Sequence, residues 1–291
     1  MKVWVLTGDK VETAINIGYS AGLLSKDMEQ YVITSLVLTE IRAQLKEIKS
    51  KIETSPNETT KQVKQRALVI AGEALVKVQE IPKMKDDFLQ LTDKMDVVIA
   101  CRVSPKQKGD IVEMIRQRFP KKMTLAIGDG ANDVAMIMRA HVGVGIAGRE
   151  GMQAARSSDY AIGKFKFLKP LLFYHGREAY RRISFLVCYN FYKNFLYVIV
   201  QFYFGFYSVF SGQTLYEPYI YQVYNVCFTG AVLFYWGVID YRYVKQRFLD
   251  EPLLYRVGME AKLFNTKVFW LWNLYACYQA FLTLFIGMVF S

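Results

Sequence analysis

Short apolar runs alternate with helical patterns over the first 165 residues of the chain. The runs have the length and composition of buried strands, and they are Val3–Leu6, Tyr31–Ile33, Ala67–Ile70, Val97–Ala100, Met123–Ile127 and Val142–Ile146. The helical patterns between them include Lys10–Ala21, Lys106–Arg118 and Asn132–Arg139. Strands that alternate with helices predict a parallel, doubly wound α/β sheet in residues 1–165, with a candidate site in the loops at the carboxyl ends of the strands.

One segment, Leu36–Arg66, interrupts this alternation. It is rich in charged residues and carries Leu45, Ile48 and Ile52 at helical spacing. We expect it to form a helical insertion on the surface of the domain, near residues 36–66, without a catalytic role.

The second part of the chain, residues 166–291, has a different pattern. Three long runs are almost entirely apolar: Phe185–Phe210 carries one charged residue, Lys193, and neither Tyr219–Ile239 nor Val268–Phe290 carries any. Each run reaches the roughly 20 residues that a helix needs to cross a bilayer. We therefore predict a membrane domain with spans at about residues 185–208, 219–240 and 268–290, in preference to three buried helices of a soluble protein.

The basic residues are placed as in a membrane protein with cytoplasmic loops. The chain of 291 residues has a net charge of +11, and its aromatic residues concentrate after residue 165. Arg177, Arg181 and Arg182 precede the first span and more Lys and Arg lie in 241–267, whereas 211–218 has neither. Because cytoplasmic loops are enriched in Lys and Arg, we expect residues 1–165 and 241–267 in the cytoplasm and 211–218 outside. This explains the positive charge without nucleic-acid binding.

The strongest chemical signal is the run Gly128-Asp129-Gly130-Ala131-Asn132-Asp133, which directly follows a predicted strand. Two carboxylates four residues apart, beside glycines that allow a sharp turn, suit a magnesium ion, which prefers oxygen ligands. A phosphoryl group in transfer needs such neutralisation of charge. The alternative is an ordinary turn between a strand and a helix, in which Asp and Asn serve as turn and cap residues.

Two further motifs follow predicted strands in the same domain. Thr7-Gly8-Asp9-Lys10 offers a hydroxyl and backbone amides at a helix start, where an anion binds readily. The run from Arg102 to Lys108 offers a lysine that can reach a phosphoryl oxygen and an arginine suited to a nucleotide phosphate. Each motif alone is common, but all three in this order, each after a strand, are specific.

Together these motifs resemble the phosphorylation domain of a P-type ATPase, and the closest likeness is to the type-IV branch, the phospholipid flippases. The resemblance rests on Thr7-Gly8-Asp9-Lys10-Val11-Glu12-Thr13, Cys101-Arg102-Val103-Ser104-Pro105 and Gly128–Asp133. Supporting stretches are Ala140–Ile146, Ser157–Tyr160, Phe191–Asn194, Phe210–Gln213, Tyr224–Val226 and Phe264–Lys267. The resemblance implies a haloacid-dehalogenase-like (Rossmann-like) fold for the first domain, followed by a transmembrane α-helical segment.

The resemblance also implies roles for the motif residues. Asp129 is expected to be the principal magnesium ligand, supported by Asp133, and Lys108 to neutralise the charge of the phosphoryl group. The remaining phosphate and nucleotide contacts are expected from Thr7, which also hydrogen-bonds the phosphoryl group, and from Gly8, Asp9, Arg102, Asn132 and Asp133. The implied reaction transfers the γ-phosphoryl group of ATP to an aspartate, with Mg²⁺ as cofactor, and then hydrolyses the aspartyl phosphate.

The family's acceptor aspartate lies in an Asp-Lys-Thr-Gly-Thr motif, and this chain has no such run. We therefore interpret the chain as a fragment of a flippase, covering the end of the phosphorylation domain and membrane helices five to seven, and expect the isolated fragment to be inactive. A smaller departure is Ala71-Gly72, where flippases usually carry Asp-Gly. By resemblance, the complete protein is a multi-pass pump of the plasma membrane or an endomembrane, with a two-span glycosylated accessory subunit.

Lys193 is the charged residue within the predicted spans that needs an explanation. It lies about ten residues into its helix, roughly 15 Å along and so near the midplane of a ~30 Å hydrocarbon core. A lysine there costs at least about 2.5 kcal/mol, and its depth makes snorkelling to an interface difficult. Asn194 and Asn225 are polar residues that can hydrogen-bond a lipid headgroup or each other. In the resembling family, the residues that match Lys193, Asn194 and Asn225 lie along the path of the headgroup, which implies transport of aminophospholipid-type lipids to the cytoplasmic leaflet.

Two other functions stay open from the sequence. A P-type cation pump is disfavoured, because cation transport requires carboxylates at membrane depth and the three apolar runs contain no Asp or Glu. A non-catalytic, membrane-anchored partner of a full-length pump stays possible, because the acceptor aspartate is absent. An Asp-Lys-Thr-Gly-Thr motif upstream in frame in the full transcript would favour the enzyme over such a partner.

Overall fold

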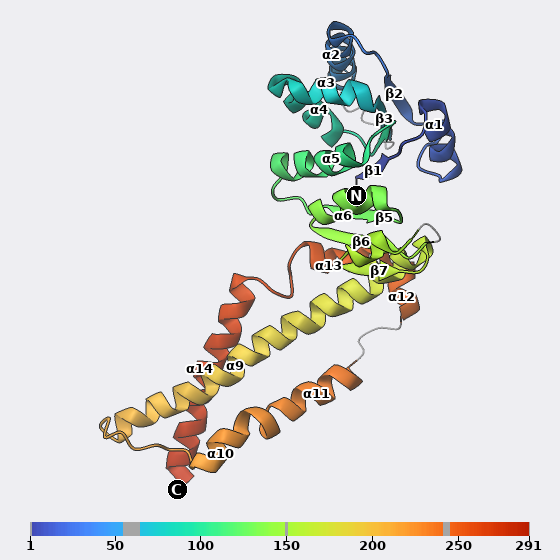
Figure 1. Cartoon of the computed structure of the whole chain (residues 1–291). Helices are drawn as coiled ribbons and strands as arrows, with labels where there is room; N and C mark the ends of the chain where they lie inside the picture. The colour runs from blue at the N-terminus through green and yellow to red at the C-terminus, as the bar shows by residue number, and fades with distance from the viewer. Residues whose placement is uncertain (1, 55–64, 149–150, 241–244, 291) are drawn as a thin grey trace. The chain divides into compact units, whose positions relative to one another are not determined.

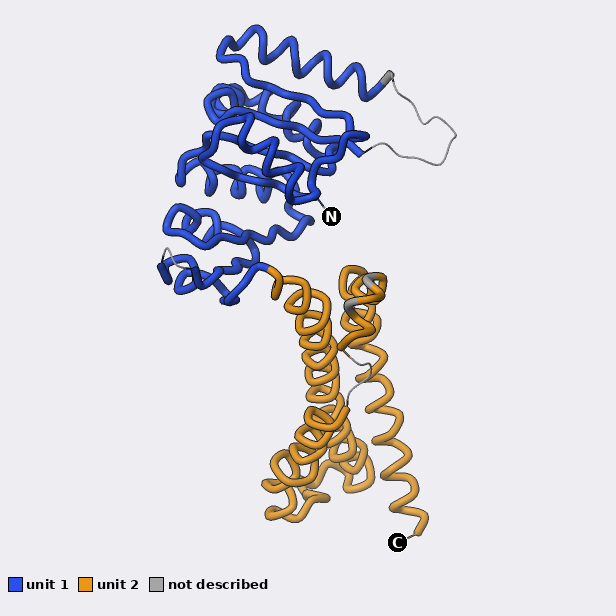
Figure 2. Tube along the Cα trace, turned by 90° about the vertical axis from the view of Figure 1, so that its right-hand side faces the viewer, with its two compact units in different colours: residues 1–165 blue, residues 166–291 orange. Residues whose placement is uncertain are grey.

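The computed structural model describes residues 2–54, 65–148, 151–240 and 245–290. It divides into two compact units, Met1–Phe165 and Lys166–Ser291 (Figure 2). The division falls where the alternation of strands and helices gives way to long apolar helices.

Unit 1 contains two parallel sheets, and the single sheet expected from the alternation is wrong in this respect (Figure 1). The larger sheet has the order β1-β4-β3-β2, with β1 (Val3–Leu6), β2 (Glu29–Ile33), β3 (Arg66–Ala71) and β4 (Val97–Cys101). The smaller has the order β5-β6-β7, with β5 (Leu125–Gly128), β6 (Val142–Ile146) and β7 (Tyr160–Ile162). Within the described residues β1 and β5 each pair with a neighbour on one side only, so the two sheets are not continuous.

Helices cover both faces of the larger sheet, as the doubly wound pattern predicts. The helices of unit 1 are α1 (Val11–Ser20), α2 (Leu38–Thr54), α3 (Gly72–Glu80), α4 (Pro82–Asp93), α5 (Pro105–Arg118), η1 (Ala131–Asp133), α6 (Val134–Arg139) and α7 (Gln153–Arg156). Val69 and Ile99 pack with Ala14 of α1, whereas Leu68 and Val98 pack with α2, α3 and α4 on the opposite face. Because successive strand residues point to opposite faces and both faces are covered, residues 67–71 of β3 and Val97–Cys101 of β4 are apolar and buried, and only Arg66 at the start of β3 is partly exposed.

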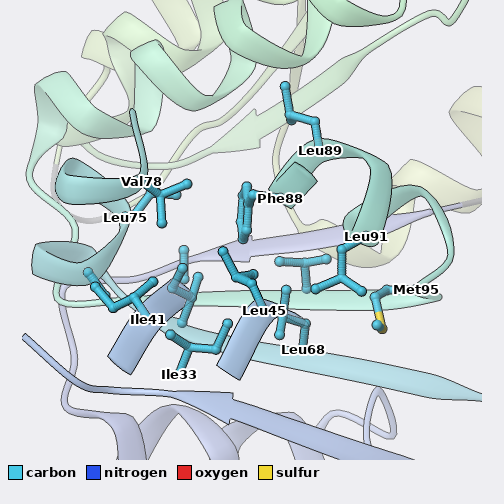
Figure 3. Close-up of a cluster of buried hydrophobic side chains, with 14 of the residues drawn as sticks. Ile33, Ile41, Leu45, Leu68, Leu75, Val78, Phe88, Leu89, Leu91 and Met95 are labelled. Atoms are coloured by element: carbon cyan, nitrogen blue, oxygen red, sulfur yellow. The ribbon is translucent and has the colours of Figure 1, made fainter. Parts of the chain in front are cut away.

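The helix α2 lies at the surface of unit 1, as expected, with one apolar face buried and most of its other residues exposed. It connects β2 to β3 of the larger sheet, so it continues the alternation of strands and helices and does not interrupt it. Its residues Ile41, Leu45, Ile48 and Ile52 are buried in the cluster that contains Phe88, as Figure 3 shows for Ile41, Leu45 and Phe88. Burying each such side chain contributes about 1.5–3 kcal/mol, so tertiary packing rather than intrinsic propensity stabilises this charged helix. Residues 55–64 of the predicted insertion lie outside the described part of the chain.

Unit 2 is helical, and three of its helical segments are long and apolar enough to cross a membrane: Phe165–Tyr207, Pro218–Ile239 and Thr266–Phe290. Its elements are η2 (Phe165–Phe167), α8 (Leu168–Pro170), η3 (Leu171–Gly176), α9 (Arg177–Tyr207), α10 (Pro218–Val223), η4 (Tyr224–Phe228), α11 (Gly230–Ile239), α12 (Lys245–Asp250), η5 (Pro252–Tyr255), α13 (Arg256–Met259) and α14 (Thr266–Phe290). Two of these, η3 and η4, are π-helical turns. The three spans expected from the sequence are therefore helical, although the first helix begins about 20 residues before the predicted span.

The first and third spans pack against each other through small side chains. Ala276 and Ala280 of α14 are fully buried, and α14 contacts α9 extensively. Small residues allow two helix backbones to approach closely, which is the main source of attraction between helices in a membrane. The pair α9–α14 is therefore the most extensively packed pair of helices in the described part of unit 2.

We predict that Gly72→Ala destabilises unit 1. A Cβ at this position would lie 2.5 Å from the backbone oxygen of Arg102, so the loop after β4 must shift, at a cost of about 1–3 kcal/mol. Gly163→Ala is the control, because no heavy atom lies within 4 Å of its added Cβ. Thermal unfolding of the complete protein measures both, and a higher midpoint for Gly72→Ala would show that helix propensity outweighs the contact.

Candidate functional site

The three sequence motifs of unit 1 lie at the carboxyl ends of strands. Leu6 of β1 is paired with Ala100 of β4, and Ala71 of β3 with Cys101, so these three strands end at the same level of the sheet. The loops that begin at Thr7, Gly72 and Arg102 are consequently neighbours. This edge of a parallel sheet is where such folds hold their ligands.

The Thr7-Gly8-Asp9 loop is held by its own side chains. The Thr7 hydroxyl donates a hydrogen bond of 2.9 Å to Oδ2 of Asp9 and accepts one of 3.1 Å from the Asp9 backbone N–H. Gly8 and Asp9 are exposed, and Lys10, at the N-cap of α1, makes no side-chain capping bond. The first turn of α1 therefore has no side-chain cap, and its positive end is the kind of position at which an anion can bind.

Backbone hydrogen bonds join this loop to the one after β4. The Arg102 N–H donates to the Asp9 carbonyl at 3.0 Å, and the Val103 N–H donates to the Thr7 carbonyl at 3.1 Å. Arg102 is exposed and has a φ of 53°, in the left-handed region that residues other than glycine seldom adopt. Such local strain often accompanies function, and here it turns the chain from β4 into α5.

The helix α5 begins with a complete capping box that fixes its first turn. The Ser104 hydroxyl accepts from the Gln107 N–H, while the Gln107 side chain accepts from the Ser104 N–H and donates to the Gly72 carbonyl. Pro105 occupies the first turn, where its missing N–H carries no penalty. The capping box thereby fixes the backbone of the turn that carries Lys108.

Lys108 forms an ion pair with Asp133. Its Nζ lies 2.8 Å from Oδ1 of Asp133, and the two side chains are only 13% and 12% exposed. Asp133 packs against the end of β5, where a Cβ on Gly128 would lie 2.2 Å from the Cβ of Asp133. The glycine is therefore required for this close approach, and the ion pair links α5 to the turn after β5.

Asp129 and Asn132 are exposed on the same turn. A magnesium site uses one or two carboxylates and several waters, whereas zinc sites need a larger set of His, Cys and acidic ligands. Within the described residues no cluster of three or more such side chains is arranged for a metal, and Asp129 and Asp133 supply two carboxylates. Two carboxylates would fit magnesium; Asp129 is exposed, whereas Asp133 is already engaged by Lys108.

Two charged or ionisable neighbours of the site are structural. Burial, and then the negative charges of Asp9 and Glu12, raise the pKa of the Cys101 thiol to about 11, so Cys101 stays neutral and is a poor nucleophile. The hydrogen bond from Arg139 to Asp110 raises the pKa of the arginine further and ties α6 to α5.

In unit 2, the structure pairs Lys193 with a residue that the sequence did not single out. Lys193 of α9 is 8% exposed, and its Nζ donates to the Thr229 hydroxyl at 3.1 Å. The side chains of Asn194 and Asn225 are exposed, so they are not brought into this buried contact. Thr229 was missed in the sequence because a single threonine in an apolar run is typical of an ordinary packed helix.

A second set of polar contacts at the start of α9 was also missed. Arg181 is bound to Glu178 at 3.0 Å and to Asp240 at 2.6 Å, and Arg177 contacts Glu178 at 3.2 Å. These buried charges explain why the helix extends beyond the apolar run, because each is paired and therefore tolerated. The opposite charges of Glu178 and Arg181, one helical turn apart, are the signal in the sequence.

Comparisons with known proteins agree on one group. Residues 155–291 match the family model described as "Phospholipid-translocating P-type ATPase C-terminal". The chain is 42% identical to "Phospholipid-transporting ATPase ID" of Homo sapiens, over 98% of this chain and 25% of that protein. It is 43% identical to "Phospholipid-transporting ATPase DRS2" of Saccharomyces cerevisiae, over 99% of this chain and 21% of that protein. The chain thus spans about a quarter of the length of the curated relatives it matches.

We predict that Lys108→Ala lowers the stability of unit 1. Removing one partner of a largely buried pair leaves Asp133 uncompensated, which costs about 3 kcal/mol, or roughly 6–12 °C in the unfolding midpoint. Lys106→Ala is the matched control, because Lys106 lies on the same helical turn and is exposed. Equal shifts for the two variants in thermal unfolding of the complete protein would contradict a structural ion pair.

Proposed function

Since the chain belongs to the type-IV P-type ATPases, the phospholipid-translocating family, we propose that it is part of an ATP-driven pump that moves phospholipids of aminophospholipid type to the cytoplasmic leaflet. In this proposal unit 1 is the end of a haloacid-dehalogenase-like phosphorylation domain, and unit 2 provides three of the membrane helices. The observation that carries the proposal is the Lys108–Asp133 ion pair, which joins two of the three motif loops at the carboxyl ends of parallel strands.

The free edges of β1 and β5 support an acceptor aspartate that lies outside this chain. The four apolar residues of β1 are only half-buried, and β1 hydrogen-bonds to β4 alone among the described strands. Leu6 of β1 also packs on the cluster that contains Ala126 of β5, so the two free edges belong to adjoining parts of one core. We infer that a further parallel strand pairs with these edges and ends at the level of Thr7 and Asp129, carrying the acceptor aspartate.

The described residues would then act on the transferred phosphoryl group as follows. Lys108 offsets negative charge on the phosphoryl oxygens. The Thr7 hydroxyl, which donates to Asp9 in this structure, would exchange that bond for one to the phosphoryl group. Arg102 and Asn132 are exposed on the adjoining loops, where they can contact the nucleotide. Magnesium, held by Asp129 with Asp133 in support, would neutralise charge that spreads over the equatorial oxygens. Asp133 further keeps the lysine in place through its Oδ1.

The membrane half supports a lipid rather than a metal cation as the transported species. A buried lysine and two exposed asparagines offer hydrogen-bond donors to a phosphate or carboxylate, and the three apolar runs contain no Asp or Glu to bind a cation. Lys193, Asn194 and Asn225 are therefore the proposed contacts of the headgroup. Unit 1 and the loop 241–267 are assigned to the cytoplasm by their basic flanks. A two-span accessory subunit and residence in the plasma membrane or an endomembrane complete the proposal.

We predict that Asp129→Asn in the complete ATPase lowers lipid-stimulated ATP hydrolysis by about 100-fold or more. Loss of the carboxylate weakens the stabilisation of charge in the transition state, an effect that reaches 10²–10³ for one preorganised group. Asp93→Asn is the control, because Asp93 is a half-exposed carboxylate at the end of α4 that pairs with Lys122. Retained turnover of Asp129→Asn at saturating magnesium would remove Asp129 from the metal site.

We also predict that Lys193→Ala weakens the stimulation of ATP hydrolysis by lipid more than it weakens phosphorylation of the enzyme by ATP. The lysine is in the membrane unit, so the phosphoryl-transfer residues stay intact when its ammonium is removed. The measurement is the phosphoenzyme level from ATP together with the phosphatidylserine dependence of hydrolysis. Val198→Ala on the exposed side of the same helix is the control, and an equal loss of both activities in Lys193→Ala would assign the lysine to folding.

A further inference from the structure

The Lys193 ammonium is held by a π-helical turn of the second span. Thr229 follows the turn η4, is 6% exposed, and its backbone N–H donates to the Tyr224 carbonyl at 3.1 Å. This bond spans five residues and widens the helix, a local irregularity that is frequent at functional sites. The hydroxyl of Thr229 lies 3.2 Å from the carbonyls of both Tyr224 and Asn225.

These contacts fix the direction of the Thr229 hydroxyl. A hydroxyl has one proton, and the carbonyls of the turn accept it, so the oxygen is left to accept from Lys193. The result is a relay in which the ammonium donates to Oγ1 of Thr229, which in turn donates to the backbone of η4. Each bond in such a chain polarises the next, which strengthens the hold on the charge in a low-dielectric site.

A second bond runs in the opposite direction between the same two spans. The Tyr224 hydroxyl donates to the Lys193 backbone carbonyl at 3.4 Å, and the Tyr224 ring stacks on Tyr197 of α9. The turn η4 is thus attached to α9 at Lys193 itself and, one helical turn later, at Tyr197. The ammonium consequently has one defined position, next to the turn that carries the exposed Asn225.

We propose that Thr229 is a positioning residue for lipid binding: its hydroxyl holds the Lys193 ammonium against the η4 turn, where the anionic group of a phospholipid meets it. This inference rests on the proposed function, and it adds a residue that acts on the lipid through Lys193. A fixed ammonium loses little conformational entropy when the anion arrives, whereas a lysine free to sample several rotamers loses more. Thr229 therefore sets the affinity for the lipid and not the rate of phosphoryl transfer.

The test compares Thr229→Val with Thr229→Ser in the complete ATPase, using phosphatidylserine titrated into phosphatidylcholine mixed micelles. Valine keeps the shape and removes the hydroxyl, whereas serine retains it. We expect Thr229→Val to raise the half-maximal phosphatidylserine concentration about tenfold, the change expected from losing one hydrogen bond to a charged group. The maximal rate and the phosphoenzyme level from ATP should stay within about twofold, and Thr229→Ser should restore the lipid affinity.

Thr283→Val is the matched control, because the Thr283 hydroxyl of α14 makes the same kind of bond to its own helix, at 2.8 Å to the Gln279 carbonyl. It should leave the half-maximal concentration unchanged. Thr229→Val should also add nothing in a Lys193→Ala background, because its effect passes through the lysine. An equal effect in both backgrounds would overturn the inference, as would loss of the phosphoenzyme in Thr229→Val alone, which would assign Thr229 to folding.

The outcomes also separate this inference from the function on which it rests. If Lys193→Ala leaves the phosphatidylserine dependence unchanged, the proposed headgroup path is wrong. If Lys193→Ala alters that dependence and Thr229→Val does not, the path stands and only the positioning role of Thr229 is wrong.

Discussion

The ion pair between Lys108 and Asp133 is the contact on which the architecture of unit 1 depends. Lys108 belongs to the helix that follows β4 of the larger sheet, and Asp133 to the turn that follows β5 of the smaller one. The two sheets share no strand ladder within the described residues, so this pair and the packing of α5 on α6 connect their carboxyl ends. Largely buried charges are tolerated only when paired, which makes the geometry of this junction specific.

Most strands of unit 1 could be predicted, because each is a short apolar run that is visible in the sequence. Val97–Ala100 and Val142–Ile146 were recognisable as strands since an enclosed parallel strand is apolar on both faces. The division into two sheets was not predictable, because it depends on which strands hydrogen-bond to each other, and the apolar runs do not reveal that pairing. The strand Tyr160–Ile162 is short and largely exposed, so it carries almost no pattern.

The candidate site was likewise predictable only in part. The order of the three motifs and their places after strands were visible in the sequence, but the partner of Lys108 was not. Either carboxylate of the Gly128–Asp133 run could have paired with it, and the choice of Asp133 comes from its packing against Gly128. The roles assigned to Thr7 and Asp129 stay predictions.

Desolvation of charge explains the main surprises in the membrane unit. Arg177, Glu178 and Arg181 are buried within the first helix, although the span predicted from hydropathy begins only after them. Lys193 is buried as well, and its hydrogen bond goes to Thr229, a residue of another span that no local pattern identifies. Polar contacts between helices form only when the fold brings the helices together, so they are the part of a membrane protein that composition predicts least.

The proposed phosphoryl site is tested most directly by a structure of the complete protein with magnesium and beryllofluoride, a stable mimic of the phosphoryl group. We expect Thr7 and Lys108 to lie within hydrogen-bond distance of the fluorides, and an Asp129 oxygen to lie about 2.0–2.1 Å from the magnesium. A map in which Asp129 does not touch the metal, or in which Lys108 and Thr7 contact different ligands, would contradict this proposal.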